Sequence, residues 1–117
     1  MEQGTLFSID RSSYTKRMAQ NLPVLRASLG VSQANLAEII GVTRQTLSAA
    51  EAGTRELSWG NFISLLFVFT QNEQTLPLLR SLGIYTEELD SMFHITNLKS
   101  LREQSAIPKK ARERETE

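Results

Sequence analysis

The fold of this chain is decided by residues 33–52, QANLAEIIGVTRQTLSAAEA. Apolar residues recur three or four positions apart within each half of the stretch, at Leu36, Ile40, Leu47 and Ala50. Gly41 stands between the halves, and glycine adopts the positive φ of a helix C-terminus without a Cβ penalty. The stretch therefore predicts two short helices, 33–40 and 44–52, joined by a tight turn.

Residues that start and stop helices extend this pattern along the chain. Side chains suited to an N-cap precede four apolar segments, at Ser32, Thr43, Ser58 and Thr86. A longer helix is expected from about residue 12 to Gly30, because apolar residues form one stripe at Tyr14, Met18, Leu22, Leu25 and Leu29. Pro23 interrupts this helix at a cost of about 3 kcal/mol if no kink forms. We therefore expect either a kink or a fresh start with Asn21 as N-cap.

The segment 59–70 is expected to form a helix that is apolar nearly all round. Leu65, Phe67 and Val68 add a second apolar face to the one that can pack under the two-helix pair. Such a helix has to be covered on both sides. We expect the second face to be covered by the C-terminal segment or by another subunit.

The C-terminal part predicts only short helical pieces. One should end at Gly83 with Pro77 in its first turn, and further helical turns are indicated around Leu98 and Leu101. The expected organisation is an N-terminal arm at 1–11, a domain at 12–71, a helical segment at 72–107 and a disordered charged tail at 108–117. Because no segment has the alternating pattern of a strand, the predicted class is all-α.

Composition excludes several kinds of function. The chain of 117 residues has no cysteine, so disulfides and thiolate metal sites are ruled out. It has a single histidine, His94, and no evident pair of catalytic acids, so we expect no enzyme, no metal site and no cofactor. The first residues do not resemble a signal peptide, and the longest apolar run is far too short to span a membrane. We therefore expect a soluble cytoplasmic protein without a membrane partner.

Charge is segregated along the chain although the net charge is zero. Residues 11–55 carry six basic and two acidic side chains, a net charge of +4, whereas residues 56–98 carry one basic and five acidic, a net charge of −4. A basic half that contains a turn-linked helix pair is suited to phosphate, because such a pair can present its second helix to the major groove of DNA. The sequence thus indicates double-stranded DNA as a partner.

Six residues at family-specific spacing strengthen this prediction: Gln33, Ala37, Gly41, Leu47, Glu51 and Gly53. With them, the chain resembles the Cro and phage-repressor (XRE-type) helix-turn-helix family from about residue 21 to residue 69. The resemblance implies a lambda-repressor-like bundle of four to five short helices, here with an added C-terminal helical segment. It also implies a homodimer that binds operator DNA and regulates transcription.

The resemblance also implies roles for individual residues. The base-reading positions would be Arg44, Gln45, Ser48 and Ala49. The phosphate-contacting positions would be Gln33, Thr43, Thr46 and Arg55. Arg26 and Glu51 match a pair that the family uses as a structural ion pair between the first and third helices. Ala49 and Ala50 are smaller than is usual in the family, so the recognition helix is expected to read fewer bases or to lie closer to its neighbours.

Two functions from different classes follow. The first is a sequence-specific transcriptional regulator, expected to be a repressor, that binds a palindromic operator as a dimer. The alternative is a protein-binding module of the antitoxin type, which would hold a protein partner through residues 72–101. A regulator that senses a small molecule is less favoured, because about thirty residues beyond the core are too few to enclose a typical ligand.

Overall fold

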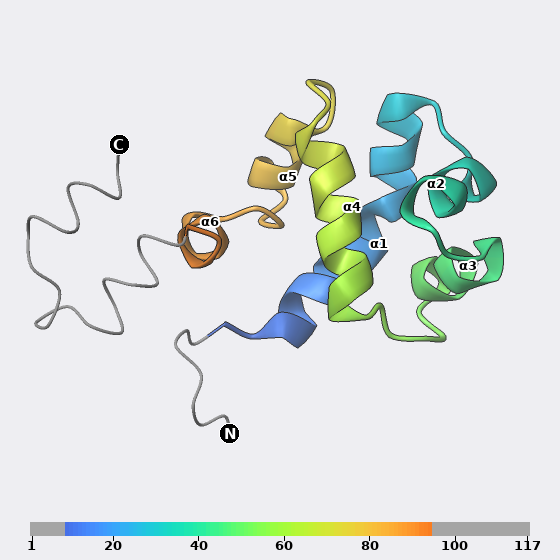
Figure 1. Ribbon diagram of the computed structural model, residues 1–117, viewed down its shortest axis with the longest axis horizontal. Helices are drawn as coiled ribbons and strands as arrows, with labels where there is room; N and C mark the ends of the chain where they lie inside the picture. Colours follow the sequence, from blue (N-terminus) through green and yellow to red (C-terminus); the bar gives the residue numbers. More distant parts are fainter. Residues whose placement is uncertain (1–8, 95–117) are drawn as a thin grey trace, which may run out of the picture. The chain divides into compact units, whose positions relative to one another are not determined.

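A computed structural model of the chain describes residues 9–94, which form six helices and no strand. The helices are α1 (Arg11–Leu29), α2 (Gln33–Ile40), α3 (Arg44–Ala52), α4 (Trp59–Thr70), α5 (Leu76–Ser81) and α6 (Glu87–Met92) (Figure 1). The predicted all-α class is confirmed. The expectations for the arm before residue 9, for the turns around Leu98 and Leu101, and for the charged tail lie outside the described residues.

The chain divides into two compact units. Residues 10–85 form the first unit with α1 to α5, and α6 belongs to the second. In α6 the Thr86 hydroxyl accepts a hydrogen bond from the Leu89 backbone N–H at 3.1 Å, as its predicted capping role requires. Glu87 and Glu88 occupy the first turn of α6, where the helix dipole favours negative charge.

Local capping explains where the helices of the first unit begin and end. The predicted caps Ser32, Thr43 and Ser58 each accept a hydrogen bond from the backbone N–H three residues later, at 3.0, 3.2 and 3.1 Å. Gly41 ends α2 with a φ of 82°, and its N–H donates to backbone carbonyls of the last turn. The helix–turn–helix geometry therefore follows from residues close to each turn.

The helix α1 runs through Pro23 without a fresh start, so that predicted alternative was wrong. Asn21 does not cap a new helix; its Nδ2 donates to the carbonyl of Arg17 at 2.8 Å. Leu22 and Leu25, on either side of the proline, are completely buried. Their packing on the neighbouring helices holds the backbone helical despite the hydrogen bond that Pro23 cannot make.

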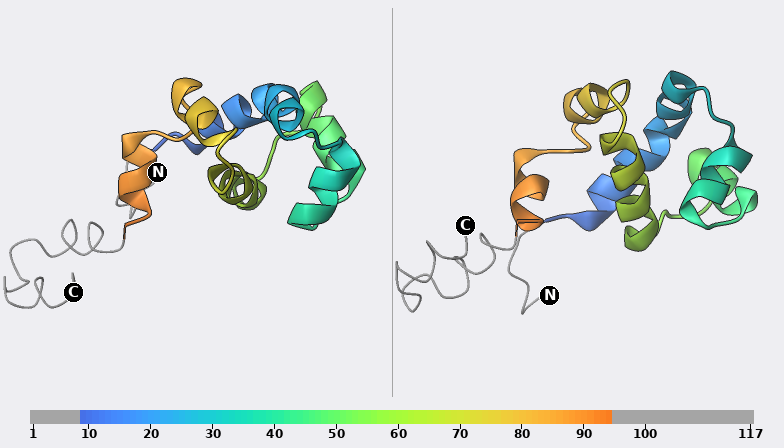
Figure 2. Two further views of the ribbon diagram at one scale, coloured as in Figure 1. Left: turned by 90° about the horizontal axis from the view of Figure 1, so that it is seen from above. Right: turned by 45° about the horizontal axis from the view of Figure 1, so that its top comes forward.

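The core lies where α1 packs against α3 and α4, α2 against α3, and α4 against α5 (Figures 1 and 2). Its completely buried side chains include Met18, Leu22, Leu25, Leu36, Leu47, Phe62, Leu65, Phe69, Leu79 and Ile84. Leu65, predicted for the second apolar face of α4, is thus in the core, whereas Phe67 of that face is 64% exposed. The second face is therefore only partly covered within the described chain.

The segment from residue 72 to residue 85 is part of this packing. Leu79 and Ile84 are buried, and the guanidinium of Arg17 on α1 donates a hydrogen bond to the carbonyl of Gly83. Thr75 is also completely buried, and its hydroxyl donates to the carbonyl of Phe69 at 2.7 Å. Across the described residues, no helix is both long and apolar enough to cross a membrane.

Candidate nucleic-acid interface

The N-terminal ends of α2 and α3 bring two predicted site residues together. Gln33 is the first residue of α2, and Arg44 is the first residue of α3. The Nη1 atom of Arg44 donates a hydrogen bond to Oε1 of Gln33 at 3.2 Å. Arg44 is exposed and Gln33 is half-buried, so the guanidinium is held at the surface by a better-packed side chain.

A bidentate ion pair between Arg26 and Glu51 lies next to Gln33 and supports this contact. The Arg26 guanidinium on α1 donates through Nε to Glu51 Oε2 at 2.7 Å and through Nη2 to Glu51 Oε1 at 3.0 Å. The side chains of Arg26 and Glu51 are 18% and 8% exposed, so the pair is largely shielded from water. The structure thus joins the two residues that were predicted to form the structural pair.

Gln33 connects the ion pair to Arg44. Its Nε2 donates to Glu51 Oε1 at 2.9 Å, while its Oε1 accepts from Arg44. Because a carboxylate can only accept, the amide has to turn its nitrogen toward Glu51 and its oxygen toward Arg44. A chain of hydrogen bonds therefore runs from α1 through α3 and α2 to the exposed first turn of α3.

The electrostatics of the pair keep both groups charged. Burial raises the pKa of the Glu51 carboxyl, but hydrogen bonds from Arg26 and Gln33 and the charge of Arg26 together bring that pKa below its ordinary value. The hydrogen bond to Glu51 raises the pKa of Arg26. The chain of contacts is consequently intact at neutral pH.

The remaining predicted base-reading residues all lie on α3. Gln45 is exposed beside Arg44, whereas Ser48 and Ala49 are half-buried. Arg44 and Gln45 are therefore the two most accessible of these side chains, and both stand in the first turn of the helix.

The predicted phosphate-contacting residues are spread over a wider surface. The hydroxyls of Thr43 and Thr46 lie 2.9 Å apart at the start of α3. Arg55 is exposed in the connection between α3 and α4, so the length of α3 separates it from Thr43. The structure brings Thr43 and Thr46 together at the start of α3, whereas Gln33 stands at the start of α2 and Arg55 follows the end of α3.

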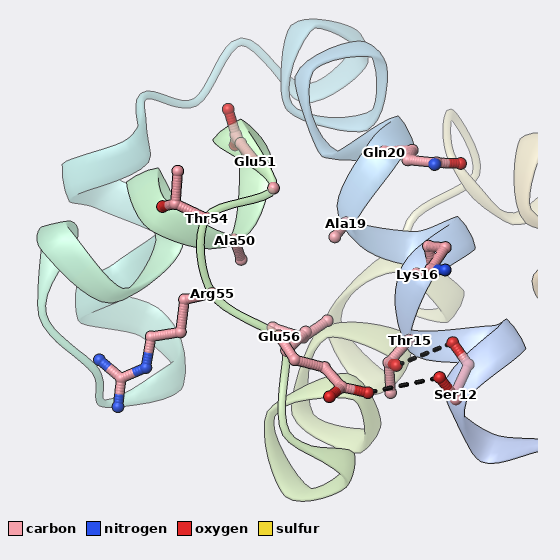
Figure 3. A pocket seen from close by; sticks show the side chains of 12 residues that line it. Ser12, Thr15, Lys16, Ala19, Gln20, Ala50, Glu51, Thr54, Arg55 and Glu56 are labelled. Carbon is pink, nitrogen blue, oxygen red and sulfur yellow. Dashed lines mark hydrogen bonds between the residues drawn. The ribbon is translucent and has the colours of Figure 1, made fainter.

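A groove of about 500 Å³ lies between α1 and the α3–α4 connection (Figure 3). Lys16 and Gln20 extend from α1 along one wall, and Arg55 points away from α1 at the other. The sequence around Lys16 shows only a positive charge, because nothing in the local pattern indicates that α1 faces this connection. Glu56, which accepts from the Ser12 hydroxyl at 3.4 Å, balances the basic lining. Among residues 9–94, no cluster of three or more His, Asp or Glu side chains could hold a metal ion.

Comparison with known proteins agrees with this geometry. Residues 25–66 match the model of a family described as helix-turn-helix, and they include all of α2 and α3. This is a DNA-binding family rather than a catalytic one, so the match supports a DNA-binding regulator. Neither a curated protein nor a solved structure matches the chain. From residue 25 to residue 66, the chain is a helix-turn-helix domain of the Cro and phage-repressor (XRE) type.

Proposed function

We propose that the protein is a sequence-specific transcriptional repressor that binds a palindromic operator as a dimer. The observation that carries this proposal is that a hydrogen bond to Gln33 fixes the Arg44 side chain in position. Its guanidinium stands at the exposed start of α3 and is oriented by Gln33, which Glu51 orients in turn. A side chain that is positioned in advance loses less conformational entropy when it binds a base.

Arg44 and Gln45 have the chemistry needed to read bases. An arginine can donate two hydrogen bonds to O6 and N7 of guanine, and a glutamine can pair with N6 and N7 of adenine. Each such contact contributes about 1–3 kcal/mol of discrimination. Ser48 and Ala49 would add weaker contacts one turn later, the Ala49 methyl against a thymine methyl.

The phosphate contacts would position α3 without reading sequence. Gln33 would contact the backbone from the start of α2, Thr43 and Thr46 from the start of α3, and Arg55 from the connection after α3. A single helix pair makes few contacts, so we expect two half-sites about one helical turn apart. The net charge of +4 over residues 11–55 is consistent with this docking face.

In vitro selection from random duplex DNA tests the proposal. The wild type and the variant Arg44→Ala/Gln45→Ala would be compared at near-physiological salt. Arg80→Ala is the matched control, because it removes an exposed arginine from α5, away from the helix pair. We expect a palindromic motif for the wild type and the control, and none for the double variant. A double variant that keeps the same motif would show that other residues read the DNA.

The alternative of a protein-binding module depends on apolar side chains in residues 72–101. The described part of that segment already uses Leu79 and Ile84 in its own core. This packing favours the DNA-binding proposal. Co-purification of a stoichiometric partner bound to this segment would favour the alternative instead.

A further inference from the structure

One side of α4 faces solvent and carries no charge. It consists of Gly60, Ile63, Ser64 and Phe67, which we call the outer face of α4. Gly60 and Phe67 are exposed, and Ile63 and Ser64 are half-buried. Phe67 is the most exposed large apolar side chain of the described residues, at 64%. The whole helix Trp59–Thr70 contains no Asp, Glu, Lys or Arg, which is unusual for a helix at a protein surface.

The hydroxyl groups on this side of α4 are already hydrogen-bonded within the helix. Ser64 Oγ donates to the carbonyl of Gly60 at 3.2 Å, and Thr70 Oγ1 donates to the carbonyl of Phe67 at 2.9 Å. A partner could therefore cover the outer face without breaking a hydrogen bond to water that these donors need. An aromatic side chain within an uncharged patch is the composition typical of an interface core.

Gly60 is not explained by contacts within the described chain. It lies inside a helix, where glycine is less favourable than alanine. A Cβ atom at this position would meet no atom within 4 Å, and the φ of Gly60 is not positive. Glycine also permits another chain to approach the backbone closely. The outer face thus combines the protruding side chain of Phe67 with the position of Gly60, two turns away, where no side chain fills the space.

We propose that the outer face of α4 binds the same face of a second copy of this chain, with the two α4 helices antiparallel. A two-fold axis requires that if residue i contacts residue j, then j contacts i. Positions 60 and 67 are symmetric about the midpoint between Ile63 and Ser64. An axis at this midpoint places Phe67 of each copy over Gly60 of the other.

Charge also favours a second copy as the occupant. A two-fold axis brings every side chain near it close to its own copy, so a charged residue there would meet a like charge. The outer face of α4 has no charge to repel its copy, whereas the surface around Gln33 and Arg44 does. A strongly charged partner would, conversely, find no complementary group on this face.

The inference rests on the proposed function because it supplies the dimer that a palindromic operator needs. In Figure 1, α2 and α3 lie to one side of α4. A two-fold axis that is perpendicular to α4 and points toward that side keeps both copies of α3 on the same side. The two recognition helices could then contact one DNA duplex.

Sedimentation equilibrium of the full chain without DNA tests the inference. We expect the wild type to dimerise and Phe67→Glu to weaken the dimer by about 100-fold or more, since two apolar burials are lost and two charges are buried. Gly60→Glu should weaken it comparably by filling the open position. The matched control is Ile39→Glu on α2, because Ile39 is similarly exposed, at 59%. The Ile39→Glu dimer should dissociate over the same concentration range as the wild-type dimer.

Thermal unfolding is followed by circular dichroism at protein concentrations too low for dimerisation. It shows whether the variants remain folded. The monomer of Phe67→Glu should melt near the wild-type temperature, because the Phe67 side chain is 64% exposed within its own chain. A wild type that stays monomeric at about 100 µM, or a Phe67→Glu dimer as tight as the wild type, would overturn the proposal. A monomeric wild type that Phe67→Glu strongly destabilises would instead mean that this chain covers its own outer face.

The selection experiment distinguishes the two failures. If the wild type forms a dimer that Phe67→Glu disrupts but enriches no DNA, the proposed function is refuted and this interface stands. A monomer that still enriches operator DNA would refute the interface and leave DNA binding standing.

Discussion

Replacing Glu51 by glutamine should destabilise the protein by about 3 kcal/mol at pH 7. Glu51 accepts two hydrogen bonds from Arg26 and one from Gln33, and its side chain is only 8% exposed. Removal of one partner from a buried pair typically costs about 3–5 kcal/mol, because the other charge stays buried. We expect the lower end, since Arg26 is 18% exposed and keeps a hydrogen bond to the carbonyl of Val31 at 3.3 Å.

Urea unfolding followed by circular dichroism measures this loss. Glu38→Gln is the matched control, because Glu38 is an exposed carboxylate on α2; its free energy of unfolding should change by less than about 0.5 kcal/mol. The double variant Arg26→Met/Glu51→Leu should be more stable than Glu51→Gln, since it leaves no uncompensated charge. A cost below about 1 kcal/mol for Glu51→Gln would refute the assignment of a shielded ion pair.

The same variant should also change the dependence of stability on pH. The pKa of Glu51 is lower in the folded state than its ordinary value of 4.5, so its contribution is fully present above that value. The contribution is lost as the pH falls through the folded pKa. The difference in unfolding free energy between wild type and Glu51→Gln should therefore shrink as the pH is lowered below about 4.5. A difference that stays constant down to pH 3 would contradict this reasoning.

Three further substitutions test the fold by urea or thermal unfolding. Gly41→Ala should cost about 1–2 kcal/mol, because φ is 82° there although a Cβ would meet nothing within 4 Å. Gly60→Ala should instead stabilise the monomer by up to about 1 kcal/mol, since this glycine is helical and equally open; equal effects at the two glycines would contradict the argument. Thr75→Val should cost about 1–3 kcal/mol, because it leaves the buried carbonyl of Phe69 without this donor; a neutral result would show that the carbonyl has another partner.

The helix boundaries around the site could be predicted because they depend on local contacts. The caps Ser32, Thr43 and Ser58 each bond a backbone group only three residues away, so sequence spacing is enough to place them. The end of α2 at Gly41 is also set locally, because the Gly41 N–H bonds carbonyls of the last turn. The positions of Arg44 and Gln45 in the first turn of α3 follow directly from the Thr43 cap.

Other features were decided by contacts between distant residues. Pro23 predicted a kink or a restart from its local cost, yet burial of Leu22 and Leu25 keeps α1 in one piece. The sequence pattern marked Leu65 and Phe67 alike as a second apolar face, and only the tertiary packing around α4 separates the buried residue from the exposed one.

The sequence by itself determined α2, α3 and α4, their caps and the residues at the start of α3, because each of these depends on neighbours within one turn of the chain. Only the tertiary structure decided how Arg44 is held. The link from Arg26 through Glu51 and Gln33 joins residues as many as 25 positions apart, on three helices. The direction in which the Gln33 amide points depends on the acceptor-only chemistry of a carboxylate that packing brings beside it.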